Sequence, residues 1–458
     1  MCNQIATPRG QLPDPRQACG AEELAFAKLF SVRFFSRFGA PAANARRRCA
    51  IGRWCAYAAA WGLSLAPCGA ALGDTLSSES SIGLQSAYNS NPFLEPSGAL
   101  NARGAESVAV LANLPATYTS DTQSLDLVPR VRFAKTRGVE ALLSDYQYLD
   151  ALWHLSSERN TFSASADWHR DSTFYNAFEN AALFGRSLRR LEEIANLDWK
   201  RDLSERSDLH ASVSWDKVAY SQSAATGLQN FSYSQGTVQY ERILSARLLW
   251  TNTVGIGRYQ VPGGSDRNDN RFAQSALKAA LSEQWAMTAQ AGYSYLTAHE
   301  QGYICCEILL GPNGLYLQPV LVAQSASRGA ANYALSFERK GERWVVDLAA
   351  SRALQPSGLG ALLTQDDVSL TASIPWTERW TLTAKLHGAQ LTESIHQLAL
   401  IHERFADFDL GANWLWTEHW SINLQGSYNL QHLTTGAPTG SGVGVNLTLF
   451  RQFGRIAL

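Results

Sequence analysis

Apolar and polar residues alternate along most of the chain after residue 80, and the stretch 365–450 shows this pattern most clearly. Every second residue from Val368 to Ile374 is apolar, and the alternation returns in Leu382–His387 and in Phe408–Trp414. Because the side chains of a β-strand point alternately to its two faces, a period of two predicts strands with one apolar and one polar face. The stretch therefore predicts a series of β-hairpins.

Turns of one form separate these strands at intervals of roughly 40 residues, the length of two strands of about ten residues, a long loop and a tight turn. The turns are Ser157-Glu158-Arg159, Ser204-Glu205-Arg206, Tyr240-Glu241-Arg242, Ser282-Glu283-Gln284, Gly341-Glu342-Arg343, Thr377-Glu378-Arg379 and Thr417-Glu418-His419. The long loops are expected at about 92–103, 170–189, 221–230, 259–270, 298–329, 353–364, 391–402 and 431–440. Such alternation of short and long connections is typical of barrels in the bacterial outer membrane.

The pattern predicts an all-β fold, a transmembrane antiparallel up-and-down β-barrel of about 18 strands, with about 16 as the alternative. Closure is expected because each unsatisfied backbone group in hydrocarbon costs several kcal/mol. A soluble sandwich would bury the aromatic face, but it leaves the tryptophans beside successive turns unexplained. Those at Trp285, Trp344, Trp380 and Trp420 are predicted to form an aromatic girdle at the membrane interface.

The N-terminal region carries the features of an export signal. Arg46, Arg47 and Arg48 precede an apolar run from Trp54 to Ala66, and small residues follow. This predicts a signal peptide at 46–73 and a barrel domain at 74–458. Residues 1–45 are expected to be a disordered extension or to lie upstream of the true start of translation, near Val32.

The composition bears on which molecules the protein binds and on the compartment that it passes through. The 458 residues carry a net charge of −1 and show no basic stripe, which argues against nucleic acid as a partner. Most of the 7 cysteines precede residue 70, which suits passage through an oxidising periplasm. Cys305 and Cys306 are interpreted as an incidental pair in the apolar 298–329 loop. That loop is expected either to fold inward as a constriction or to add a hairpin.

Several polar side chains are candidates for lining a water-filled lumen. They are Arg130, Arg132, Asp198, Lys200, Lys385, Asp407 and Asp409. Charges that face a lumen bias the passage of ions. No catalytic residue, metal site or cofactor is predicted.

Three histidine groupings are candidate parts of a hydrolase: His169 with Asp167 and Asp171, His210 with Asp216, and His387 with Ser373. The sequence has no G-x-S-x-G elbow in a strand-to-helix context. His396 and His402 are spaced unlike metal ligands. The chain is therefore expected not to be an enzyme.

The Glu-Arg and Glu-His turns, the segment Arg352–Gly360 followed by Asp366 and Val368, and Asn89–Pro92 together resemble one family. They are similar to the outer-membrane β-barrel porins of proteobacteria, including uncharacterised barrels encoded near exopolysaccharide and exosortase loci. The resemblance covers nearly the whole mature chain. It implies fold and location, and it transfers no catalytic residue.

We therefore expect a protein exported through the periplasm to the bacterial outer membrane, with membrane lipid and the barrel-assembly machinery as partners. The expected function is passive passage of small solutes, with saccharides as a candidate class. The alternatives are a non-conducting accessory of exopolysaccharide export or surface assembly, and an outer-membrane hydrolase. Conductance in a planar bilayer separates the solute channel from the non-conducting accessory.

Overall fold

The structure, a computed structural model, describes residues 75–95, 103–139, 142–175, 187–221, 228–263, 267–311, 314–358, 360–393, 402–433, 439–454 and 456–457, with only the backbone for 300–324. Two compact units divide the chain, residues 1–69 and 70–458, and the described residues belong to the second. The predicted signal peptide and the 1–45 extension lie outside the described residues.

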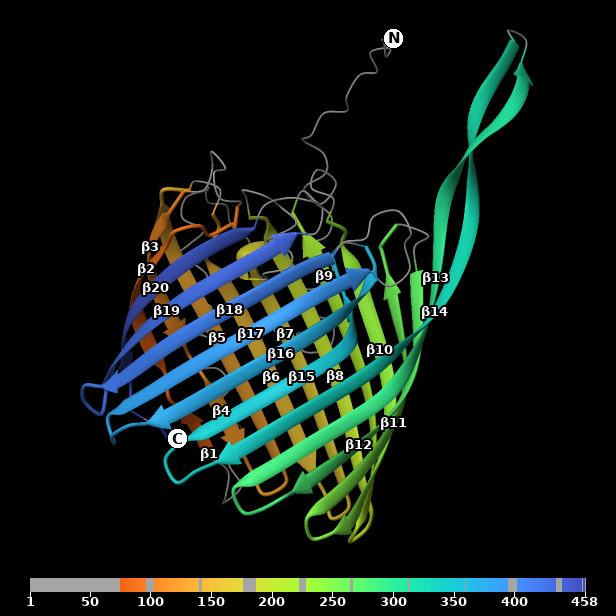
Figure 1. Ribbon diagram of the computed structural model, residues 1–458. Coiled ribbons are helices and arrows are strands. Elements are labelled where there is room, and N and C mark those ends of the chain that lie inside the picture. Colours follow the sequence, from red (N-terminus) through yellow and green to blue (C-terminus); the bar gives the residue numbers. More distant parts are fainter. Residues whose placement is uncertain are drawn as a thin grey trace, which may run out of the picture. The chain divides into compact units, whose positions relative to one another are not determined.

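The second unit is a β-sheet closed on itself (Figure 1). Its strands are β1 (Thr75–Ser78), β2 (Ser81–Asn89), β3 (Ala105–Asn113), β4 (Ala116–Thr119), β5 (Gln123–Arg137), β6 (Tyr146–Ser156), β7 (Asn160–Ser172), β8 (Arg189–Ser204), β9 (Ser207–Tyr220), β10 (Phe231–Ser245), β11 (Leu248–Gln260), β12 (Arg267–Ala280), β13 (Trp285–Gly311), β14 (Gly314–Lys340), β15 (Val345–Pro356), β16 (Leu362–Pro375), β17 (Trp380–Glu393), β18 (His402–Leu415), β19 (Trp420–Leu433), β20 (Gly440–Gln452) and β21 (Ile456–Ala457). A short 3₁₀ helix, η1 (Thr173–Tyr175), follows β7.

Closure joins the two ends of the sheet. Strand β20 pairs antiparallel with β2, and every other neighbouring pair along the chain is also antiparallel. The result is the predicted barrel of 18 strands. No helix within the described ranges is long and apolar enough to cross a membrane.

The strands beside the closing seam are interrupted near the ends that meet the tight turns. Strand β5 pairs with β3 along one half and with β4 along the other. The break between β3 and β4 contains Pro115, and the Leu114 amide there donates a 3.0 Å bond to the Pro129 carbonyl. Because a proline has no backbone N–H to donate to the ladder, it is tolerated at a break between strands such as this one. Strands β1 and β21 pair with each other beyond the same seam.

The two faces of the wall differ in chemistry. The register places Leu348, Leu370 and Leu386 side by side on one face, and these side chains are 44%, 40% and 50% exposed. On the other face the neighbouring row carries Asp347, Thr371, Lys385 and Asp409. Apolar outside and polar inside is the arrangement that lets a closed sheet span a membrane.

In three of the tight turns, the side chain of the first residue stabilises the turn by hydrogen bonding to the backbone. The hydroxyl of Thr377 accepts bonds from the amides of Arg379 and Trp380, at 3.2 and 3.1 Å. The hydroxyls of Thr417 and Ser282 accept equivalent bonds in their own turns. Serine and threonine favour turns for this reason. Six of the seven predicted Glu-containing turns are in the place that the sequence indicates.

The seventh prediction is wrong. Tyr240-Glu241-Arg242 lies inside β10, and the turn comes later, at Ala246 and Arg247. Glu241 pairs across the ladder with Asp208 on one side and Thr251 on the other. Here the Glu-Arg pair is part of the alternating pattern of β10, which continues to Ser245 before the chain turns.

The segment 298–329 forms a hairpin, one of the two outcomes that the sequence predicts for it. Strand β13 loses its partner β12 after His299, and β14 gains its partner β15 only at Tyr333. Between these points β13 and β14 pair with each other alone and extend as a two-stranded ribbon past the barrel wall (Figure 1). The ladder register shifts between Ile304 and Glu307, where the two cysteines lie.

Candidate functional site

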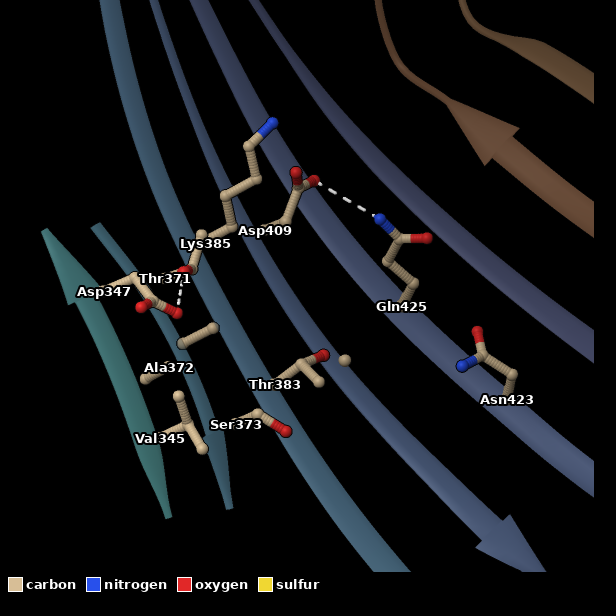
Figure 2. A pocket seen from close by; sticks show the side chains of 12 residues that line it. Val345, Asp347, Thr371, Ala372, Ser373, Thr383, Lys385, Asp409, Asn423 and Gln425 are labelled. Atoms are coloured by element: carbon tan, nitrogen blue, oxygen red, sulfur yellow. Dashed lines mark hydrogen bonds between the residues drawn. The ribbon is translucent and has the colours of Figure 1, made fainter. Parts of the chain in front are cut away.

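The polar face of β15–β19 forms a hollow of about 370 Å³ (Figure 2). Its lining includes Asp347, Lys385, Asp409, Asn423 and Gln425. Gln425 donates a 3.5 Å bond to Asp409, and Figure 2 shows the Lys385 and Asp409 side chains projecting from neighbouring strands. Strand alternation explains this grouping, because every second residue of adjacent strands faces the same side.

One step further along the same strands, a histidine links two carboxylates. His387 Nδ1 lies 2.8 Å from Asp407 Oδ1, and its Nε2 lies 3.2 Å from Asp367 Oδ1. Lys385 Nζ lies 3.5 Å from the other Asp407 oxygen. The Asp407 side chain is 9% exposed, and a carboxylate this buried needs such partners. Three sequence-predicted residues, Lys385, Asp407 and Asp409, therefore belong to one cluster.

A second charged cluster lies on the polar face of β5–β8. Arg130 forms an ion pair with Asp150, and His169 Nε2 lies 2.7 Å from the second oxygen of the same carboxylate. His169 Nδ1 lies 3.3 Å from Glu192. Arg130 on β5 and His169 on β7 thus share one aspartate on β6, the strand between them.

The network continues towards the end of β7. Arg190 donates two bonds to Asp171, at 3.0 and 3.1 Å, and a third to Glu192 at 3.3 Å. Tyr148 donates a 2.8 Å bond to Asp171, and its ring stacks on Tyr146 at 4.6 Å between centroids. Paired arginine–carboxylate forks hold their geometry better than single bonds. This wall therefore carries arginines and carboxylates that are joined by ion pairs.

The other predicted polar residues lie apart. Arg132 donates a 3.1 Å bond to Gln85 on β2 and bonds the Ser144 carbonyl. Lys200 Nζ lies 3.0 Å from Asp208 and 3.7 Å from Asp202, close to a tight turn. Asp198 lies on the same face of β8, between Ser163 and Ser212 in the register.

In the structure, the histidines of the candidate hydrolase groupings contact other partners. His387 contacts Asp407 and Asp367 rather than Ser373. His210 contacts Glu241, at 3.5 Å, rather than Asp216. Sequence patterns do not identify Asp150, Glu192 and Glu241 as partners of these histidines, because each of the three lies on a neighbouring strand. Cross-strand contacts depend on register, and no local motif records it.

The four predicted tryptophans lie on the apolar side at the tight-turn end. Trp285, Trp380 and Trp420 each begin a strand, and Trp344 comes directly before β15. The Arg339 guanidinium lies over the rings of Trp285 and Trp344, at 4.9 and 4.5 Å. Trp380 stacks on Trp414 at 5.5 Å. Amphipathic rings and snorkelling arginines are typical of the membrane–water boundary.

The closed antiparallel wall, the exposed apolar belt and the tryptophan row decide the architecture. The chain is an outer-membrane β-barrel. No family model and no curated protein matches it.

Several solved structures resemble the barrel. The E. coli ferric-catecholate import receptor Fiu is 10% identical, with a TM-score of 0.44, over 84% of this chain and 82% of that one. A BenF-like porin from Pseudomonas fluorescens gives 10% identity and a TM-score of 0.44, over 82% and 99% of the two chains. OccK2 of Pseudomonas aeruginosa, in complex with glucuronate, gives 10% and 0.41, over 82% and 98%. These neighbours are porins and receptors, and none links the chain to exopolysaccharide loci.

Proposed function

We propose that the protein is a passive channel for small polar solutes across the outer membrane. The observation that supports this is the polar face, which carries charged and amide side chains on strand after strand. Barrels of about 16–18 strands are wide enough to leave an aqueous channel, whereas barrels of about 8 strands are filled by side chains. The predicted residues Arg130, Arg132, Asp198, Lys200, Lys385, Asp407 and Asp409 would then line the lumen.

Selectivity would come from the two charged clusters. Each mixes both signs: Lys385 with Asp407 on one wall, and Arg130 and Arg190 with carboxylates on the other. Such walls exclude neither sign of ion and favour polar, hydrogen-bonding solutes over apolar ones. We expect weak overall ion selectivity.

Saccharides are the solute class that we favour. The stacked rings of Tyr146 and Tyr148 lie beside Arg130, whose guanidinium is 5.3 Å from the Tyr148 centroid. Asp171 and Asp150 contribute carboxylate oxygens next to these rings. Aromatic faces flanked by polar groups with fixed orientation suit rings that carry many hydroxyls, because apolar and hydrogen-bonding contacts are offered together.

Reconstitution tests the proposal. The barrel, refolded in detergent and verified by circular dichroism, is added to planar bilayers and to liposomes swollen in a pentose, a hexose or a trisaccharide. We expect discrete current steps and a swelling rate that falls with sugar size. A folded barrel that gives neither steps nor swelling would contradict the proposal and favour a non-conducting role.

A further inference from the structure

A cluster of three metal-ligating side chains lies on the polar face of β9 and β10, apart from the clusters on β5–β8 and β15–β19. Among the described residues, Asp208, His210 and Glu241 each offer a ligand atom, and these atoms all lie within 4.8 Å of one another. Asp208 and His210 are two positions apart on β9 and share its face, and Glu241 is the register partner of Asp208 on β10. The strand geometry thus brings one imidazole and two carboxylates together.

The distance between His210 and Glu241 fits shared coordination of one ion better than a hydrogen bond. His210 Nε2 is buried and has no hydrogen-bond partner, although Glu241 Oε2 lies 3.5 Å away. Two ligands of a tetrahedral zinc ion, each about 2.0–2.1 Å from the metal, are separated by roughly 3.4 Å. The imidazole nitrogen and the carboxylate oxygen are therefore already at the spacing of two ligands on one ion.

An outer layer of hydrogen bonds orients the Glu241 carboxylate. The Thr253 hydroxyl donates a 3.1 Å bond to the side-chain oxygen Oε1 of Gln239, and Nε2 of the same side chain donates a 2.8 Å bond to Glu241 Oε1. Only Oε2 is left to face His210. Outer-layer bonds of this kind fix the orientation of ligands in metal sites.

We propose that Asp208, His210 and Glu241 bind a divalent transition-metal ion, with zinc as the best match. Imidazole nitrogen and carboxylate oxygen are both ligands that zinc accepts, and three protein ligands leave one position for water. The site lies at the tight-turn end of the wall, two residues into β9. It does not depend on whether the barrel conducts.

The positive charge of Lys200 opposes binding of the metal ion. Its ammonium lies 3.0 Å from Asp208 and occupies one oxygen of that carboxylate. A positive charge this close lowers the affinity of the site for a cation. The site therefore binds moderately, and removal of the Lys200 charge strengthens it.

The test measures zinc binding to the full barrel without a polyhistidine tag, by isothermal titration in detergent. We expect about one equivalent of zinc. His210→Ala should abolish this binding, and Gln239→Leu, which keeps all three ligands, should weaken it by about 10–100-fold. Lys200→Met should tighten it by about tenfold. His154→Ala, which removes an imidazole on the polar face of β6 that bonds Ser156, serves as the control and should change nothing.

Cobalt substitution gives an independent readout. The visible spectrum should show nitrogen and oxygen ligands without thiolate charge transfer, and it should vanish in His210→Ala. The proposal is overturned if His210→Ala and the unchanged protein bind zinc equally well, if the cobalt spectrum is unaffected by that substitution, or if no saturable binding occurs. Heat-modifiable migration of each variant on gels confirms that the barrels compared are folded.

Discussion

The hydroxyl of Tyr259 on β11 donates a 2.8 Å hydrogen bond to the carbonyl oxygen of Ser357, 98 residues further along the chain. The backbone N–H of Gln229 donates a second bond, of 2.6 Å, to the backbone carbonyl oxygen of Gly358. Tyr259 is fully buried, in an apolar cluster with Tyr220, Phe231, Leu296 and others. These contacts hold the connection between β15 and β16 against the polar face of β9–β11, at the end of the barrel where the long loops lie.

Tyr259→Phe should loosen this connection. The variant removes one hydrogen bond, worth about 1 kcal/mol, and leaves the ring in its apolar surroundings. If the connection narrows the channel, bilayer recordings should show larger and noisier current steps. Tyr428→Phe, on the exposed apolar face of β19, is the matched control and should leave the recordings unchanged. Identical traces from all three proteins would mean that the connection does not border the solute path.

Gly360 is required by backbone geometry in the same connection. Its φ is +92°, and a Cβ at this position would lie 2.9 Å from the side-chain nitrogen Nε2 of Gln229. Gly360→Ala should lower the free energy of unfolding by about 1–2 kcal/mol, because L-residues are strained in this region. Urea titration in detergent measures the effect. Gly426→Ala, where the added methyl group meets nothing within 4 Å, should cost little or nothing.

Lys385 should influence ion selectivity. Lys385→Glu would place a third carboxylate beside Asp407 and Asp409, so the reversal potential in a salt gradient should shift towards cation preference. Lys217→Glu makes the same charge change on the other face of the wall, where Lys217 pairs with Glu193 at 3.4 Å. It should leave the reversal potential unchanged. An equal shift in both variants would show that only net charge matters.

The apolar belt predicts a directional stability effect. Leu197 is 63% exposed near the middle of β8, and its replacement by lysine should destabilise the barrel in lipid by about 2–4 kcal/mol. Ser214→Lys, on the polar face of the adjacent strand, should cost much less. Urea titrations of both variants in phospholipid vesicles make the comparison. Equal losses would contradict the assignment of the two faces.

The signal-peptide prediction can be tested on the protein extracted from outer membranes. N-terminal sequencing should begin near Asp74, because small residues end the apolar run there. A membrane-bound peptide that covers Thr7 to Arg16 would contradict both the cleavage site and a downstream start.

Local sequence predicts much of this fold because the decisive signal has a period of two. The alternation around Leu370 or Leu386 fixes strand type and face without any knowledge of neighbours. The turn at Thr377 is also local, since its hydroxyl bonds amides two and three residues away. The number of strands follows from these two signals together.

Contacts between distant residues could not be predicted in this way. His169 is held by Asp150 and Glu192 because the β6–β7 and β7–β8 registers place them opposite, and a shift of one residue would put other side chains there. The inward fold of the Ser357 connection depends on Tyr259, a residue of another hairpin. The sequence does not place the turn after Glu241 correctly, because a Glu-Arg pair suits both a turn and an alternating strand.

The most direct test of the two-faced wall compares neighbouring residues on β9. Val213→Cys and Ser214→Cys, each in a background without other cysteines, are labelled with bimane and reconstituted in brominated phospholipid. Val213 is 58% exposed on the apolar face, so its label should be strongly quenched by the lipid bromines. The label at 214 should be quenched little and should respond to iodide in the aqueous phase. Equal quenching at both positions would contradict the account.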